Sequence, residues 1–72
     1  MTKHTFQLDG EFIEIHNLLK LLALAQSGGA AKHLVADGLV TVDGEVETRK
    51  TRKLRVGNVV RIGEDEVTVV GK

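Results

Sequence analysis

Basic side chains gather in one part of this 72-residue sequence. Six cationic residues and no acidic residue lie between positions 48 and 62, namely Arg49, Lys50, Arg52, Lys53, Arg55 and Arg61. Like charges at this density repel one another unless a polyanion or neighbouring acids neutralise them. The spacing therefore predicts either a phosphate-binding surface or a hydrated loop balanced by Glu45 and Glu47, and the charges alone fit both interpretations.

The formal net charge of zero does not exclude a polyanionic partner. The acids lie outside the basic stretch, with Asp9, Glu11 and Glu14 near the N-terminus and a second acidic cluster at residues 64–66. An electrically balanced molecule can still carry one strongly positive face, because a sum of charges says nothing of their arrangement.

A second candidate phosphate contact is the start of a predicted helix at Ser27. Exposed backbone amides at a helix N-terminus can hold a phosphate, and glycine at positions 28 and 29 lets that phosphate approach closely. Lys32 lies one helical turn beyond Gly28 and projects from the same face. The alternative interpretation is that Gly28 and Gly29 only permit a tight turn between two helices.

Three histidines, His4, His16 and His33, are the side chains whose ordinary pKa lies near neutral pH. Their spacing is not that of a metal site, and the absence of cysteine removes thiolate ligands and thiol nucleophiles. No phosphate-binding glycine loop followed by lysine is present. We therefore expect no catalytic residue, no metal and no cofactor, with His33 as an auxiliary phosphate contact beside Lys32.

Strand and helix patterns alternate in the first half of the chain. Residues 5–8 and 11–15 flank an Asp-Gly pair and predict a short hairpin. The spacing of Ile15, Leu18, Leu19 and Leu22 then predicts an amphipathic helix. Ser27 is the predicted N-cap of a second helix. The buried stripe of this helix is expected to consist of Ala31, Leu34 and Val35, and Gly38 is expected to end the helix in a left-handed conformation.

The second half of the chain predicts strands. Val40, Val42 and Val46 alternate about Asp43-Gly44, a pair typical of a type I′ turn. A further β region covers residues 54–62, and a turn at residues 63–66 leads to a strand at 67–70. This order predicts an α+β fold in which two short helices pack on a small, mostly antiparallel sheet.

Length and composition set the remaining expectations. A chain of 72 residues allows one domain, at residues 1–72, and Phe6 and Phe12 are its only aromatic residues. We assign both rings to the core, which leaves no aromatic side chain for stacking on nucleic-acid bases. The absence of cysteine and of a run of about eighteen apolar residues predicts a soluble, cytoplasmic protein that does not bind membranes.

Four segments carry a resemblance to a known family. The stretch SGGAAKHLVADGLVTVDG at residues 27–44 resembles the helix-then-hairpin signature of the S-four RNA-binding domain, whose core is the alpha-L motif. The stretch LRVGNVVRI at residues 54–62 is similar to the family's final strand. Residues 18–21 and 46–50 also have counterparts in short, stand-alone members of the YbcJ type, so the likeness covers roughly residues 15–62.

The resemblance implies an RNA-binding protein whose partner is structured RNA, such as rRNA, tRNA or a ribosomal particle. It also implies a phosphate-facing charge at Lys20. One departure is Gly28, which stands where many such domains have arginine. The predicted RNA-binding residues are Lys20, Ser27, Gly28, Lys32, His33, Arg49, Lys50, Arg52, Lys53 and Arg55. Recognition is expected through phosphates, 2′-hydroxyls and the shape of a stem, bulge or junction, with little direct base reading, by a monomer.

Two other classes of partner stay open. A protein-protein adaptor would use the leucine-rich first helix or an exposed sheet edge, and its binding would respond to a change such as Leu21→Ala more than to salt. DNA ranks below RNA, because the start of the second helix carries few side chains that read base edges. For RNA, neutralising Arg49, Lys50, Arg52 and Lys53 together is expected to weaken binding with the fold intact.

Overall fold

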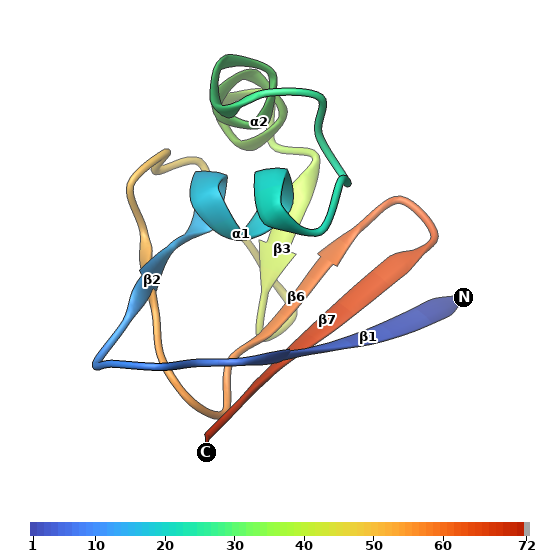
Figure 1. The fold of residues 1–72 in the computed structure, drawn as a ribbon. Coiled ribbons are helices and arrows are strands. Elements are labelled where there is room, and N and C mark those ends of the chain that lie inside the picture. The colour runs from blue at the N-terminus through green and yellow to red at the C-terminus, as the bar shows by residue number, and fades with distance from the viewer. Residues whose placement is uncertain (72) are drawn as a thin grey trace.

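The structure is a computed structural model that describes residues 1–71 (Figure 1). Its elements follow one another as β1 (Thr2–Gln7), β2 (Ile13–Glu14), α1 (Ile15–Leu21), α2 (Gly28–Ala36), β3 (Val40–Val42), β4 (Glu45–Val46), β5 (Lys53–Leu54), β6 (Val59–Ile62) and β7 (Asp65–Val70). No helix within residues 1–71 has the length and apolar character needed to cross a lipid bilayer.

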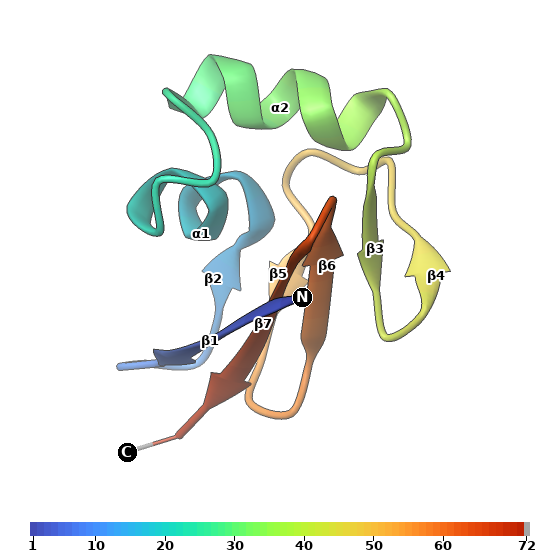
Figure 2. The same ribbon diagram turned by 90° about the vertical axis from the view of Figure 1, so that its right-hand side faces the viewer.

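Five strands form the main sheet, in the order β1-β7-β6-β3-β4, and β2 and β5 form a separate pair. Every pairing is antiparallel except that of β1 with β7. Figure 2 shows both helices on one side of the strands, with α2 outermost. The predicted α+β fold, with two helices packed on a mostly antiparallel sheet, is therefore confirmed.

The predicted N-terminal hairpin is wrong. β1 pairs in parallel with β7 over six positions, from Thr2↔Asp65 to Gln7↔Val70, whereas β2 pairs with β5. A type I′ turn requires a positive φ at both central residues; Gly10 has a φ of 124°, but Asp9 is not among the residues with a positive φ, so residues 9 and 10 do not form that turn. A six-residue ladder with a strand distant in sequence replaces a short local one.

The helix signals are confirmed. Ile15, Leu18 and Leu19 are fully buried on α1. Ala30 N donates to Ser27 Oγ at 3.1 Å, which satisfies one of the amides left free at the start of α2. At its other end Gly38 adopts a φ of 76°, the left-handed conformation that glycine tolerates without strain.

The predicted hairpin of β3 and β4 is also confirmed. Asp43 and Gly44 have φ values of 52° and 86°, and both are positive, as a type I′ turn requires. The neighbouring pairing of β3 with β6 places Thr41 opposite Arg61. This hairpin fixes the start of the basic stretch, which follows β4 directly.

The core lies between the helices and the strands. Its fully buried members include Val35 of α2, Leu54 of β5 and Val67 of β7, so both helices and both sheets contribute to it. Phe6 packs against this core from β1. Phe12, in contrast, is 39% exposed and lies outside the core, which overturns the prediction that both rings are buried.

Candidate functional site

The basic stretch follows β4 and runs through β5; we call residues 47–55 the basic segment. In Figures 1 and 2 the loop between β4 and β5 passes next to α2. Ile15 N donates to Arg52 O at 2.9 Å, which ties this loop to the start of α1, and the β2–β5 pairing holds the part that follows. The segment is thus anchored to secondary structure on two sides.

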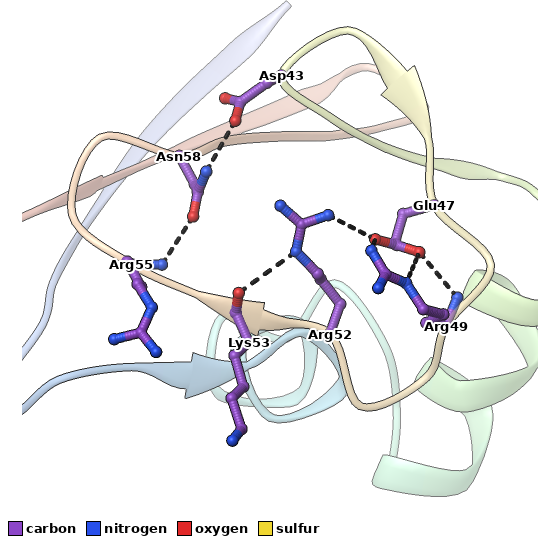
Figure 3. Close-up of polar contacts among 7 residues, drawn as sticks. All are labelled: Asp43, Glu47, Arg49, Arg52, Lys53, Arg55 and Asn58. Atoms are coloured by element: carbon purple, nitrogen blue, oxygen red, sulfur yellow. Dashed lines mark hydrogen bonds and ion pairs between the residues drawn. The ribbon is translucent and has the colours of Figure 1, made fainter.

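Glu47 is the organising acid of the basic segment (Figure 3). It is only 6% exposed, and Arg49 Nε and Nη2 donate to its two carboxylate oxygens at 3.0 Å each. Arg52 Nη1 donates to Oε1 at 2.7 Å, and Arg49 N donates to Oε2 at 3.0 Å. These hydrogen bonds, with the Arg49 side chain the largest contributor, lower the pKa of Glu47 to about 2.

The interpretation in which acids balance the cations therefore applies to part of the stretch. Glu47 neutralises one of the two charges on Arg49 and Arg52, and Glu66 lies 3.6 Å from Arg61 on the neighbouring strand. Glu45 forms no ion pair with any residue that the structure describes. Over residues 47–55, five cations against one carboxylate leave a net charge of +4.

Lys53 and Arg55 project away from Glu47, toward β2 (Figure 3). Lys53 Nζ lies 4.8 Å from the centroid of the Phe12 ring, and Arg55 Cζ lies 5.9 Å from it. Arg55 Nη1 also donates to Glu11 O at 3.3 Å. The remaining cation of the segment, Lys50, is exposed and forms no ion pair within residues 1–71. The segment thus has one pair of cations around an acid and another around an aromatic ring.

A polar brace fixes the end of the basic segment. Asn58 Oδ1 accepts from Arg55 N at 2.7 Å, and Asn58 Nδ2 donates to Asp43 Oδ2 at 2.7 Å. Val59 N donates to Asp43 Oδ1 at 2.9 Å; this bond, followed by that from Asn58, lowers the pKa of Asp43. The sequence reasoning missed this brace. Its signal was an acid in the Asp-Gly turn and an asparagine directly after Gly57.

A shallow surface depression lies over the segment, lined by Arg49, Thr51, Arg52 and Lys53. A guanidinium has five N–H groups. Arg49 uses two of them on Glu47, and Arg52 uses one on Glu47 and one on Lys53 O at 3.4 Å. Planar guanidinium groups and hydroxyls match the oxygens of a phosphate group. The lining is therefore suited to an anion.

The second predicted contact, the start of α2, is also exposed to ligands. The amides of Gly28 and Gly29 donate no hydrogen bond within residues 1–71. Lys32 and His33 on α2 and Lys20 on α1 are exposed, and no hydrogen bond or ion pair in the described chain joins them to the basic segment. The structure thus joins Arg49 to Arg52 through Glu47 and Lys53 to Arg55 through Phe12.

Comparison with known proteins places this architecture in a family. A family model described as the S4 domain matches residues 6–70. The chain belongs to the S4 domain family. The resemblance predicted from four short segments is thereby confirmed, and the S4 domain match extends beyond them to include the last two residues of β1 and all of β7.

This S4 domain is similar to two relatives and to one solved structure. "Putative RNA-binding protein YbcJ" of Escherichia coli (strain K12) is 45% identical over 58 residues, which cover 81% of this chain and 83% of YbcJ. "Probable ribosome maturation protein RlbA" of Bacillus subtilis (strain 168) is 44% identical over 55 residues, covering 76% and 78%. The solution structure of E. coli YbcJ, described as revealing an alfaL motif involved in RNA-binding, aligns with a TM-score of 0.65 and 38% identity over 97% of this chain and 87% of that one.

Proposed function

We propose that this S4 domain, acting as one unit over residues 1–72 and as a monomer, binds structured RNA through the basic segment and the start of α2. The partner class is rRNA, tRNA or a ribosomal particle, and the domain performs no catalysis of its own. The names of YbcJ and RlbA support RNA and the ribosome as the setting. A cytoplasmic location remains a prediction that follows from this function.

The observation that carries the proposal is the pair of guanidinium groups held by Glu47. A long arginine side chain loses conformational entropy when it grips a phosphate, and one that is already oriented loses less. Arg49 and Arg52 are oriented by hydrogen bonds of 2.7–3.0 Å to a buried carboxylate and line a surface depression. Glu47 thus neutralises one positive charge and also orients the Arg49 and Arg52 side chains for binding.

The helix residues supply the second part of the proposed contact. Unpaired amides at Gly28 and Gly29 favour an anion, and Ser27 keeps the first turn of α2 in register by capping it. Lys20 and Lys32 would add cations next to that anion, and His33 would add a ring N–H donor. In this proposal the RNA is long enough to reach from the start of α2 to the basic segment, as a stem or junction would be.

The test compares two single-charge variants with the same formal charge. Lys50→Gln removes a cation of the basic segment that makes no ion pair within residues 1–71, and Lys3→Gln removes one from β1. We expect Lys50→Gln to weaken binding to an RNA stem-loop and to lower the log–log salt slope by about 0.7–0.9. Fluorescence anisotropy across a salt series measures both. Equal slopes for the two variants would contradict the proposal.

Because Glu47 is buried, the variant that neutralises four cations of the basic segment needs one further change. Neutralising Arg49, Lys50, Arg52 and Lys53 together was expected to leave the fold intact, but it would strand the Glu47 carboxylate without a charged partner. An unpaired buried charge costs about 3–5 kcal/mol. The informative set therefore adds Glu47→Gln to the four changes and uses Glu47→Gln alone as its control.

The adaptor alternative has a narrower basis than the sequence suggested. Leu18 and Leu19 of the leucine-rich α1 are fully buried, while Leu21 is 64% exposed. The α1 helix therefore buries most of its apolar face in the core. If Leu21→Ala abolished association with ribosomes and Lys50→Gln left it unchanged, an adaptor would replace RNA binding as the function.

A further inference from the structure

Phe12 sits between β1 and β2 with 39% of its surface exposed, although the chain has only two aromatic residues. A single exposed apolar side chain is ordinary in a soluble protein. Phe12 differs from such a residue because two cations lie against its ring, Lys53 Nζ at 4.8 Å and Arg55 Cζ at 5.9 Å from the centroid. We call these three residues the Phe12 platform.

The Phe12 platform is held in place from several directions. β2 follows Phe12 directly and pairs with β5, which contains Lys53, through Ile13↔Leu54. Arg55 is fixed by its side-chain bond to Glu11 O at 3.3 Å and by the bond from its amide to Asn58 at 2.7 Å. The ring and its cations come from segments about forty residues apart in sequence, at residues 12 and 53–55. Their meeting is therefore a product of the fold.

An aromatic ring beside two cations matches one kind of RNA component. An unpaired base presents a flat π-face that stacks on phenylalanine or on a guanidinium plane, and the phosphate of the same strand pairs with lysine and arginine. A base inside a continuous stem has both faces covered by its neighbours and cannot use the ring. An acidic peptide would meet the cations without needing the exposed aromatic ring.

We propose that the Phe12 platform holds one unpaired nucleotide of the bound RNA, with the base against Phe12 and its phosphate against Lys53 and Arg55. This inference rests on the proposed function, because Lys53 and Arg55 of the platform belong to the basic segment, and Lys53 also lines the depression that is suited to an anion. It makes the ligand more specific: the domain binds a stem interrupted by a bulged nucleotide, and prefers it to the same stem without the bulge.

The test uses two RNA hairpins that differ by a single bulged nucleotide in the stem. Phe12→Leu keeps an apolar side chain and removes the π-face, and it leaves every charge in place. Stacking on an aromatic side chain is worth about 1–3 kcal/mol per base, which corresponds to a loss of about 5- to 150-fold in affinity. We expect this loss on the bulged hairpin alone, with an unchanged salt slope. No loss, or the same loss on both hairpins, overturns the proposal.

A second readout does not depend on affinity. The chain contains no tryptophan and no tyrosine, so Phe12→Trp introduces a single indole at the platform. We expect the bulged hairpin to quench its fluorescence, since a base stacks on it, and the paired hairpin to leave it bright. The matched control is Leu39→Trp, which places an indole at a site that is 56% exposed and outside the platform. Equal quenching at the two positions contradicts stacking at Phe12.

The two proposals fail in different ways. If Lys50→Gln weakens both hairpins and Phe12→Leu weakens neither, the domain binds RNA and the Phe12 platform does not contribute. If Lys50→Gln and the charge-neutralised basic segment leave both affinities unchanged, RNA binding by this surface is itself refuted. Binding of an acidic peptide that depends on Lys53 and competes with the bulged RNA would replace the nucleotide by a protein ligand.

Discussion

Glu47 shows how one acidic residue can serve a basic surface. Its carboxylate is 6% exposed and receives hydrogen bonds from both Arg49 and Arg52. A buried carboxylate is stable only when its lone pairs are occupied, so the fold requires the arginines to stay close to it. The same hydrogen bonds therefore orient the Arg49 and Arg52 side chains and stabilise the loop between β4 and β5.

The same contacts predict how stability depends on pH. The pKa of Glu47 falls from 4.5 to about 2 in the folded chain, so the unfolded chain binds the proton more readily. Its contribution is fully present above about pH 4.5 and is lost as the pH falls toward 2, by an amount on the order of 3 kcal/mol. We expect Glu47→Gln to flatten the acid limb of the stability curve in urea unfolding measured between pH 5 and pH 2.

Glu45→Gln is the control for this acid titration. Glu45 is exposed and forms no ion pair with the described residues, so its removal leaves the acid limb as it is. A Glu47→Gln variant whose stability falls between pH 5 and pH 2 as steeply as that of the parent chain would show that other carboxylates govern acid unfolding.

At the scale of elements, the hairpin of β3 and β4 supports the turn that ends the basic segment. Asp43 lies in the turn between β3 and β4 with a positive φ, and its carboxylate accepts hydrogen bonds from Val59 N and Asn58 Nδ2. Asn58 then reaches Arg55 N. The polar residue after the glycine in the family's final-strand signature is therefore structural in this chain, because it joins two turns that are distant in sequence.

This brace predicts a stability loss from a single exchange. Asn58→Ala removes the partner of Arg55 N and of Asp43, and each hydrogen bond is worth about 0.5–1.5 kcal/mol. For a domain of this size a loss of 1 kcal/mol lowers the Tm by about 4–8 °C. We expect a drop in that range by thermal unfolding. Asn17→Ala, at an exposed position of α1, is the matched change and should be neutral or slightly stabilising.

Some of these elements could be predicted from the sequence, and others could not. Local chemistry predicted the Ser27 cap, the Gly38 stop and the Asp43-Gly44 turn, because each depends on neighbours within a few residues. The partner of β1 could not be found in this way. A hairpin and a parallel pairing with β7 bury the same alternating side chains, and only the distant strand distinguishes them.

The candidate site shows the same division. The basic stretch and the acids able to balance it are visible in the sequence, but the burial of Glu47 is a property of the folded loop. Phe12 was assigned to the core because apolar rings are usually buried, but it is 39% exposed beside β2, whose pairing with β5 was not predicted. Residue types thus identified the chemistry, and long-range pairing decided which side chains meet.

At the scale of the whole molecule, the zero net charge hides a separation of charges. In Figure 1 the acidic turn between β6 and β7 and the loop between β4 and β5 lie on opposite sides of the molecule. Charges separated by more than the Debye length, about 8 Å at physiological salt, are largely screened from one another. The local field over the basic segment should therefore govern an anionic ligand more than the total charge does.

Two variants with the same total charge separate these influences. Glu45→Gln and Glu64→Gln each raise the formal net charge by one, but Glu45 lines a hollow together with Arg49 and Arg52, whereas Glu64 lies in the distant acidic turn. We expect Glu45→Gln to strengthen binding to an RNA stem-loop about two- to fivefold at physiological salt, because a carboxylate close to the phosphates repels them. Glu64→Gln should change the affinity by less than about twofold, since its charge is screened. Anisotropy titrations that gave the two variants equal gains would mean that the RNA responds to total charge, and the basic segment would lose its claim to be the binding surface.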